Sequence, residues 1–159
     1  MKILIVSDTH GSHRNLEKVL EKVGKIDKLI HLGDVEGGDD YIKAIAGCPT
    51  HIVAGNNDFW SDLPQQDDLF ISGHHIFLTH GHYFYVSRDE ERLMAEARRR
   101  GADIVIYGHI HRPMWHQEEG LLVLNPGSIA FPRQQGRRPS YMIMEISDAG
   151  EVNVKLEYI

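Results

Sequence analysis

Five short polar clusters hold side chains of the types that bind metal ions in proteins. They are Asp8-Thr9-His10, Gly33-Asp34, Gly55-Asn56-Asn57-Asp58, His80-Gly81-His82 and Gly108-His109-Ile110-His111. Imidazole nitrogens combined with carboxylate oxygens are typical ligands of Zn, Mn, Fe and Ni. Any one cluster is a weak signal in a chain with 11 histidines. Five of them in succession indicate one site for divalent ions.

The spacing inside two clusters suits a shared ion. Asp8 and His10 are two residues apart, as are His109 and His111. In an extended segment, residues i and i+2 point to the same side, so each pair would present two ligand atoms to one ion. Glycines adjoin the polar residues in four clusters, which is typical of backbone that turns sharply or approaches a ligand closely.

Each cluster follows a short apolar segment that we expect to form a buried strand. The segments are residues 3–6, 29–32, 51–54, 76–79 and 104–107. They are rich in β-branched residues, as buried strands of parallel sheets are. Ligands of open α/β sheets bind at the carboxyl ends of the strands. We therefore expect the five clusters to meet in one pocket.

Three helices are expected between the strands. Ser12 could cap the first helix, in which apolar residues recur at helical spacing. Asp39 or Asp40 could cap a second helix that runs through Ile45, and a third helix lies between residues 87 and 100.

The strands of the second half predict antiparallel pairs. Gly73-His74 is expected to join two of them by a tight turn. Residues 121–124, 141–146 and 152–158 indicate a meander. Together with the first half, this order predicts an α/β fold in which two mixed β-sheets pack as a sandwich with helices on the outer faces.

No internal repeat or linker divides the chain, so we expect a single domain over residues 1–159. Residues 60–68 and 113–120 are the loops long enough to form a modest rim, which predicts an open site.

Composition excludes several classes of protein. The 159 residues are 42% hydrophobic and 25% charged, which is ordinary for a globular domain. No apolar stretch approaches the roughly 20 residues that cross a bilayer. Cys48 is the single cysteine, so no intrachain disulfide can form. A cleaved signal peptide would remove Asp8 and His10. For both reasons we expect a cytoplasmic protein. The net charge of −6 makes duplex nucleic acid an unfavourable partner.

Taken together, the clusters resemble the sequence pattern of the calcineurin-like metallophosphoesterase superfamily. That pattern is Asp-x-His, Gly-Asp, Gly-Asn-His-Asp/Glu, a His often followed by Gly, and Gly-His-x-His. All five blocks occur in this order between residues 8 and 111. Asn125-Pro126-Gly127-Ser128 and Pro132-Arg133 extend the resemblance to a subgroup of small prokaryotic phosphodiesterases. The resemblance covers nearly the whole chain and implies the four-layer fold of that superfamily.

The resemblance also implies two divalent ions, with Mn(II) expected and Ni, Zn or Fe as alternatives. Carried over residue by residue, it assigns one ion to Asp8, His10, Asp34 and His111. It assigns the other ion to Asp34, Asn56, His80 and His109, so that Asp34 bridges the two. Two such ions roughly 3.5 to 4 Å apart can lower the pKa of a shared water. We therefore expect direct attack by a metal-bridging hydroxide.

Three further residues are catalytic candidates. Asn57 stands where many superfamily members carry a His that resembles a general acid, and Asn has no proton to give at neutral pH. Asp58 is expected to orient a neighbouring residue. His82 is either a substrate contact and substitute proton donor, or a surface histidine. Asn56, Asn57 and Arg133 are the candidates for substrate binding.

The leading hypothesis is hydrolysis of a small or activated phosphodiester. A phosphomonoesterase or nuclease with the same centre is the nearest alternative. A non-catalytic scaffold of the same fold, as in a subunit of retromer, is the alternative from another class. Aromatic residues at 59–60 and 83–85 could line the pocket or cover an interface in a homo-oligomer.

Overall fold

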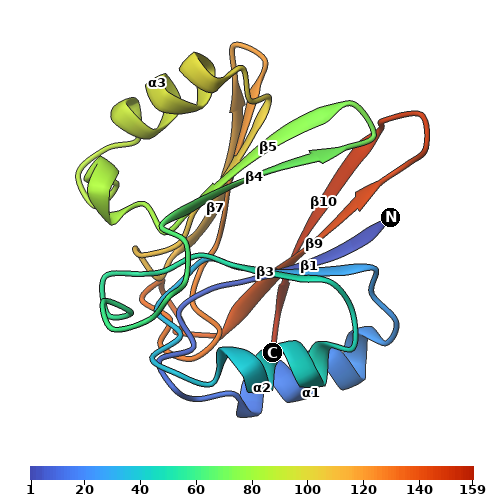
Figure 1. The fold of residues 1–159 in the computed structure, drawn as a ribbon, viewed down its shortest axis with the longest axis vertical. Coiled ribbons are helices and arrows are strands. Elements are labelled where there is room, and N and C mark those ends of the chain that lie inside the picture. The colour runs from blue at the N-terminus through green and yellow to red at the C-terminus, as the bar shows by residue number, and fades with distance from the viewer.

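The computed structural model describes residues 1–159 and contains ten strands and three α-helices (Figure 1). In chain order the elements are β1 (Lys2–Val6), α1 (Arg14–Val23), β2 (Lys28–His31), α2 (Asp39–Ala46), β3 (Thr50–Ile52), β4 (Gln66–Ile71), β5 (His74–Thr79), the 3-10 helix η1 (His82–Phe84), α3 (Glu91–Arg100), β6 (Ile104–Ile106), β7 (Pro113–Glu118), β8 (Leu121–Pro126), β9 (Ser140–Ile146) and β10 (Val152–Tyr158).

The strands form two mixed five-stranded sheets. The first sheet has the order β10-β9-β1-β2-β3, in which β1, β2 and β3 are parallel and β9 and β10 are antiparallel additions. The second has the order β4-β5-β6-β8-β7, with parallel β5, β6 and β8 between antiparallel edge strands. In Figure 1, α1 and α2 cover one outer side of the sandwich and α3 the other. The predicted α/β sandwich with outer helices is confirmed.

Burial on both faces of β1 explains why its residues 3–6 are all apolar. Ile3 and Ile5 belong to a cluster of 15 buried residues between the two sheets, whereas Leu4 and Val6 pack with residues of the outer helices. A strand buried on both faces has no polar side, so it appears in the sequence as a continuous hydrophobic run.

None of the helices combines the length and the apolar character needed to span a membrane.

The helix starts differ from the predicted caps. The first helix has His13 at its N-cap and not Ser12, and no side chain caps it. Gly38, in a left-handed conformation with φ of 80°, precedes the second helix in place of Asp39 or Asp40. Asp39 lies in the first turn, where its carboxylate pairs with Lys43. In both helices the conformation of the preceding loop determines which residue stands at the N-cap, and the local sequence pattern does not predict that conformation.

Three predictions about strands are wrong. The tight turn is Ser72-Gly73, one residue earlier than Gly73-His74. Residues 113–118 form β7 and not a rim loop. The meander does not exist as one unit, because β8 joins the second sheet while β9 and β10 join the first.

Candidate metal centre

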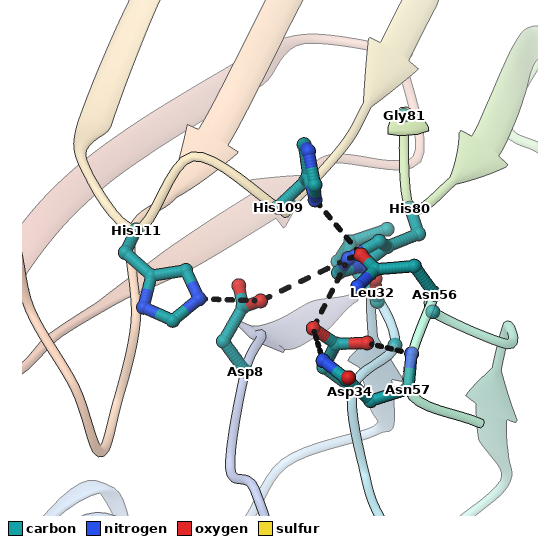
Figure 2. A network of polar contacts seen from close by, with 12 residues as sticks. Asp8, Leu32, Asp34, Asn56, Asn57, His80, Gly81, His109 and His111 are labelled. Carbon is teal, nitrogen blue, oxygen red and sulfur yellow. Dashed lines mark hydrogen bonds and ion pairs between the residues drawn. The ribbon is translucent and has the colours of Figure 1, made fainter. Parts of the chain in front are cut away.

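The five polar clusters meet at one edge of the sandwich (Figure 2). They follow the carboxyl ends of β1, β2, β3, β5 and β6, which come from both sheets. The expected convergence therefore occurs, and it requires the packing of one sheet on the other as well as the parallel order within each.

Four side chains form the first group of possible metal ligands. Ligand atoms of Asp8, His10, Asp34 and His111 all lie within 4.8 Å of one another. His111 Nε2 is 3.2 Å from Asp8 Oδ1, and His10 Nε2 is 3.7 Å from Asp34 Oδ2. The two Nε2 atoms of His10 and His111 are 3.3 Å apart. Separations of this size place the four ligand atoms around a common point.

The second group surrounds the amide oxygen of Asn56. His80 Nε2 lies 3.2 Å from Asn56 Oδ1, and His109 Nδ1 lies 3.0 Å from the same oxygen. His80 Nε2 is also 3.5 Å from Asp34 Oδ2. The Oδ2 atom of Asp34 is therefore close to both groups, and all seven residues that the sequence indicates lie together.

Asp8 is the most unusual of these residues. Its side chain is fully buried, and neither carboxylate oxygen accepts a hydrogen bond, although His111 lies beside it. A buried carboxylate that accepts no hydrogen bond is costly, and pairing with a metal ion is one way in which proteins compensate such a charge. The donor set of carboxylates, imidazoles and one amide oxygen suits a divalent cation. The residues present therefore fit a metal centre.

Five of the seven residues hold left-handed backbone conformations. The φ angles of Asp8, His10, Asp34, His109 and His111 lie between 45° and 71°. Such conformations cost of the order of 1 kcal/mol or more per non-glycine residue, and they cluster at functional sites. Their concentration on the candidate ligands indicates that the loops are shaped to direct side chains and not for local stability.

Hydrogen bonds fix the orientation of three imidazole rings. His10 Nδ1 bonds Glu36 Oε1 at 2.6 Å, and the Nδ1 atoms of His80 and His111 bond the backbone oxygens of Leu32 and Phe131 at 2.5 and 2.7 Å. In a neutral imidazole, an Nδ1 that donates to an oxygen acceptor leaves the opposite Nε2 unprotonated and free to bind a cation. In each ring that Nε2 faces the other candidate ligands.

Asn57 and Asp58 hold the centre in different ways. The backbone and side-chain amides of Asn57 donate to the two oxygens of Asp34 at 2.9 and 2.8 Å. Burial would raise the pKa of Asp34, but its bonds with His80 and Asn57 outweigh burial and lower that pKa below the usual range. Asp58 accepts three backbone N–H groups, from Val35, Glu36 and Gly55, and so ties together the loops after β2 and β3. Its contacts are those of a positioning residue.

His82 and Arg133 lie at the margin of the seven residues. The half-buried His82 ring is 5.4 Å from the His80 ring and 6.2 Å from the His109 ring, measured between centroids. Its buried Nδ1 has no hydrogen-bond partner. Burial, with His80 and His109 nearby, lowers the pKa of His82 to about 4. Arg133 is exposed and lines a cavity that reaches His10 and His111.

Residues 1–149 match the family described as the calcineurin-like phosphoesterase superfamily domain. The chain belongs to this superfamily. It is 33% identical over 154 residues to the probable metallophosphoesterase YsnB of Bacillus subtilis, an alignment that covers 96% of this chain and 89% of the relative. The family relationship supports a phosphoester hydrolase in general. Members use divalent metals, and the Asp/His cluster described above is the place where such a metal could bind.

Solved structures agree with this membership. A predicted phosphoesterase of Streptococcus pneumoniae is 31% identical with a TM-score of 0.80, over 99% of this chain and 97% of that one. An archaeal phosphodiesterase is 27% identical with a TM-score of 0.72, over 99% and 100% of the two chains. Vps29 of Entamoeba histolytica, solved as a complex with zinc, is 25% identical with a TM-score of 0.79, over 99% of each chain.

The predictions from the sequence do not include several supporting residues of this candidate site. Glu36 lies two residues after Asp34, the same spacing as Asp8 and His10, and that spacing was the available signal. The carbonyl groups of Leu32 and Phe131 carry no signal, because every residue has a carbonyl. Gly55 shows why glycine is needed beside the ligands, since an added Cβ would collide with the Asp34 carboxylate.

The end of β8 and the turn that follows it connect two of the ligand loops, near the centre as the resemblance implies. Ser128 Oγ donates to the backbone oxygen of Asp8 at 2.9 Å, and Asn125 Nδ2 donates to that of Gly108 at 2.8 Å. Both donors are fully buried. They hold together the loops that carry Asp8 and His109.

Proposed function

We propose that this protein is a phosphodiesterase that uses two divalent ions to hydrolyse small phosphodiesters. Asp8, His10, Asp34 and His111 would hold one ion, with Asp34, Asn56, His80 and His109 holding the other. The observation that carries the proposal is the position of Asp34 Oδ2, which is 3.7 Å from His10 Nε2 in the first group and 3.5 Å from His80 Nε2 in the second. An oxygen between two sets of imidazoles is suited to bridge two cations.

The charge of the centre supports binding of a phosphate ester. Two divalent ions against the carboxylates of Asp8 and Asp34 leave a surplus of positive charge, which attracts an anionic substrate. When bound, such ions activate water and neutralise charge that develops on the phosphoryl oxygens. The side chains of Asn56 and Asn57 are exposed at the open side of the centre, where a substrate would approach.

The role of Asn57 favours esters with good leaving groups over esters with basic alkoxide leaving groups. Its side-chain amide already donates to Asp34, and an amide supplies no acidic proton to a departing alkoxide. Leaving groups that depart without protonation are therefore the suitable ones. The similarity to an archaeal phosphodiesterase supports phosphodiesters as the substrate class.

The proposal is tested by metal reconstitution. Protein stripped of metal is loaded separately with Mn, Ni, Zn, Fe or Mg, and its metal content and its rates on bis(p-nitrophenyl) phosphate and p-nitrophenyl phosphate are measured. We expect about two equivalents of metal, with Mn(II) giving the highest activity and the diester cleaved faster. Asp34→Asn should lose at least one equivalent and most activity. The matched control is Asp40→Asn, because Asp40 is exposed and remote from the centre.

Two results would contradict the proposal. One is a folded protein that binds no transition metal, and the other is metal-loaded protein that prefers the monoester. A protein that binds metal but cleaves neither ester would support the second candidate, a scaffold. The Vps29 structures favour that candidate by similarity of fold, and Phe59, Trp60, Tyr83 and Tyr85 offer exposed aromatic surface for a partner.

A further inference from the structure

Beside the candidate metal centre lies a cavity with an unusual set of charges. Its volume is about 940 Å³, within the range of small-molecule sites. His10 and His111 form part of its wall, which makes it continuous with the centre. Arg112, Arg133 and Arg137 are also among the residues that line it.

These three arginines have no carboxylate partner in the protein. Four other arginines do: Arg99 and Arg100 both bond Glu96, Arg98 is 3.3 Å from Glu119, and Arg88 is 3.5 Å from Asp89. Arg14, Arg92 and Arg138 also lack a carboxylate partner, but they do not line this cavity. The carboxylate that lines the cavity, Glu36, is bonded to His10 Nδ1. In a chain with a net charge of −6, three unpaired cations in one cavity are a local excess that an anion would balance.

The backbone carries these arginines at defined positions relative to the ligands. Arg112 follows His111 directly. The backbone N–H of Arg133 donates to the His111 oxygen at 2.9 Å, and His111 Nδ1 bonds the Phe131 oxygen at 2.7 Å. Arg137 is held in a left-handed conformation with φ of 44°. The loop that presents Arg133 is therefore tied to a candidate metal ligand.

We propose that Arg112, Arg133 and Arg137 form a second anion subsite, so that the preferred substrates are phosphodiesters that also carry a terminal phosphate group. The inference rests on the proposed function and names the substrate class of that site. A diester phosphate has one negative charge and would occupy the metal centre. A terminal phosphate has nearly two and presents several acceptor oxygens, which match planar guanidinium groups.

The first test compares two esters that differ only in the second phosphate. Thymidine 5′-(p-nitrophenyl phosphate) and its 3′-phosphorylated form release the same leaving group. For the wild-type protein, the 3′-phosphate should lower KM by about tenfold. Arg133→Ala and Arg137→Ala should each remove most of this advantage. Arg138→Ala is the matched control, because it removes the same charge from the adjacent position, where the side chain stacks on Tyr158 outside the cavity.

The second test measures anion binding without metal or turnover. Inorganic pyrophosphate is titrated into metal-free protein in the presence of a chelator, and binding is followed by calorimetry. We expect binding by the wild type and by Arg138→Ala, and binding at least tenfold weaker for the Arg133→Ala/Arg137→Ala double variant. Circular dichroism of each variant confirms that it is folded.

The two tests separate this inference from the proposed function. If the plain ester is hydrolysed but the 3′-phosphate gives no advantage and pyrophosphate does not bind, the arginine subsite is wrong and the phosphodiesterase stands. If neither ester is hydrolysed but pyrophosphate binding depends on the arginines, the anion subsite stands and the phosphodiesterase is wrong. Equal pyrophosphate binding by the double variant overturns the subsite in either case.

Discussion

Asp8 combines two properties that reduce the stability of a folded chain. Its carboxylate is buried without a hydrogen bond, and its backbone is left-handed with φ of 57°. Asn would remove the buried charge, because its side chain is neutral. The presence of Asp at this position is understandable where a cation neutralises it.

Replacing Asp8 therefore gives opposite effects with and without metal. Asp8→Asn should raise the free energy of unfolding in chelator by about 1 kcal/mol, because a fully buried charge whose close polar neighbours are imidazoles is removed. It should also weaken metal binding by 100-fold or more, of the order expected for loss of a charged ligand. Denaturant unfolding with EDTA and with Mn(II) measures both effects. A variant less stable than wild type in EDTA would contradict this account.

The position of Asn57 predicts how rates depend on the leaving group. With Asn57, rates on a series of aryl and alkyl phosphodiesters should fall steeply as the leaving-group pKa rises, because no residue at this position protonates the leaving oxygen. Asn57→His should make that dependence shallower. An unchanged slope, with metal content equal to wild type, would count against the interpretation.

His31 should make the protein less stable in mild acid. It is fully buried, its Nδ1 accepts from the Gly33 N–H, and burial lowers its pKa to about 4. In the unfolded chain His31 binds a proton near pH 6.5, whereas in the folded protein it binds one only near pH 4. The free energy of unfolding therefore decreases as the pH falls through this window. At pH 5 the loss should be about 2 kcal/mol.

The measurement compares wild type with His31→Gln. Urea unfolding at pH 7 and pH 5 gives the pH-dependent difference for each protein, and subtraction removes the contribution of the other ten histidines. Gln lacks a titrating group, so the variant should show about 2 kcal/mol less dependence on pH. Equal differences for the two proteins would show that His31 is not the group responsible.

Among the elements, those with a buried face were predictable and those without one were not. The strands before the five clusters were found from their apolar runs, and β10 was found with its bounds at residues 152–158. In contrast, β7 packs no apolar residue against a core cluster, whereas β10, also an edge strand, packs Val152, Val154 and Leu156 against the core between the sheets. Without a buried face, a strand leaves no hydrophobic pattern in the sequence.

The turn between β4 and β5 offers a stabilising substitution. Ser72 and Gly73 both have positive φ, at 49° and 87°, as a type I′ turn requires. Asn is favoured at the first of these positions, so Ser72→Asn should stabilise the protein by about 0.5 kcal/mol. Thermal unfolding should show a midpoint about 1 to 2 °C higher. Ser72→Val, which is β-branched, should lower the midpoint, and a lower midpoint for the Asn variant would exclude this turn geometry.

At the scale of the whole molecule, the sequence indicated the members of the site but not how the two sheets would assemble. β9 pairs with β1 across most of the chain, with Lys2 opposite Glu145. Which sheet a strand joins depends on such distant pairings, and local periodicity contains no information about them. For this reason the local pattern predicts one meander for the last strands, although the local spacing is enough to indicate the residues of the centre.

The apolar layer between the sheets also has a chemical consequence. Asp8 and Asp34 follow strands of one sheet, and His80 and His109 follow strands of the other. The thickness of the apolar layer between the sheets therefore determines the distance between the candidate metal ligands on the two sheets. Ile106 is fully buried in this layer, so Ile106→Val should change the ratio of Mn(II) to Zn(II) affinity in competition titrations without altering any ligand. Selectivity for one metal ion would then depend on apolar core side chains that do not contact the ion.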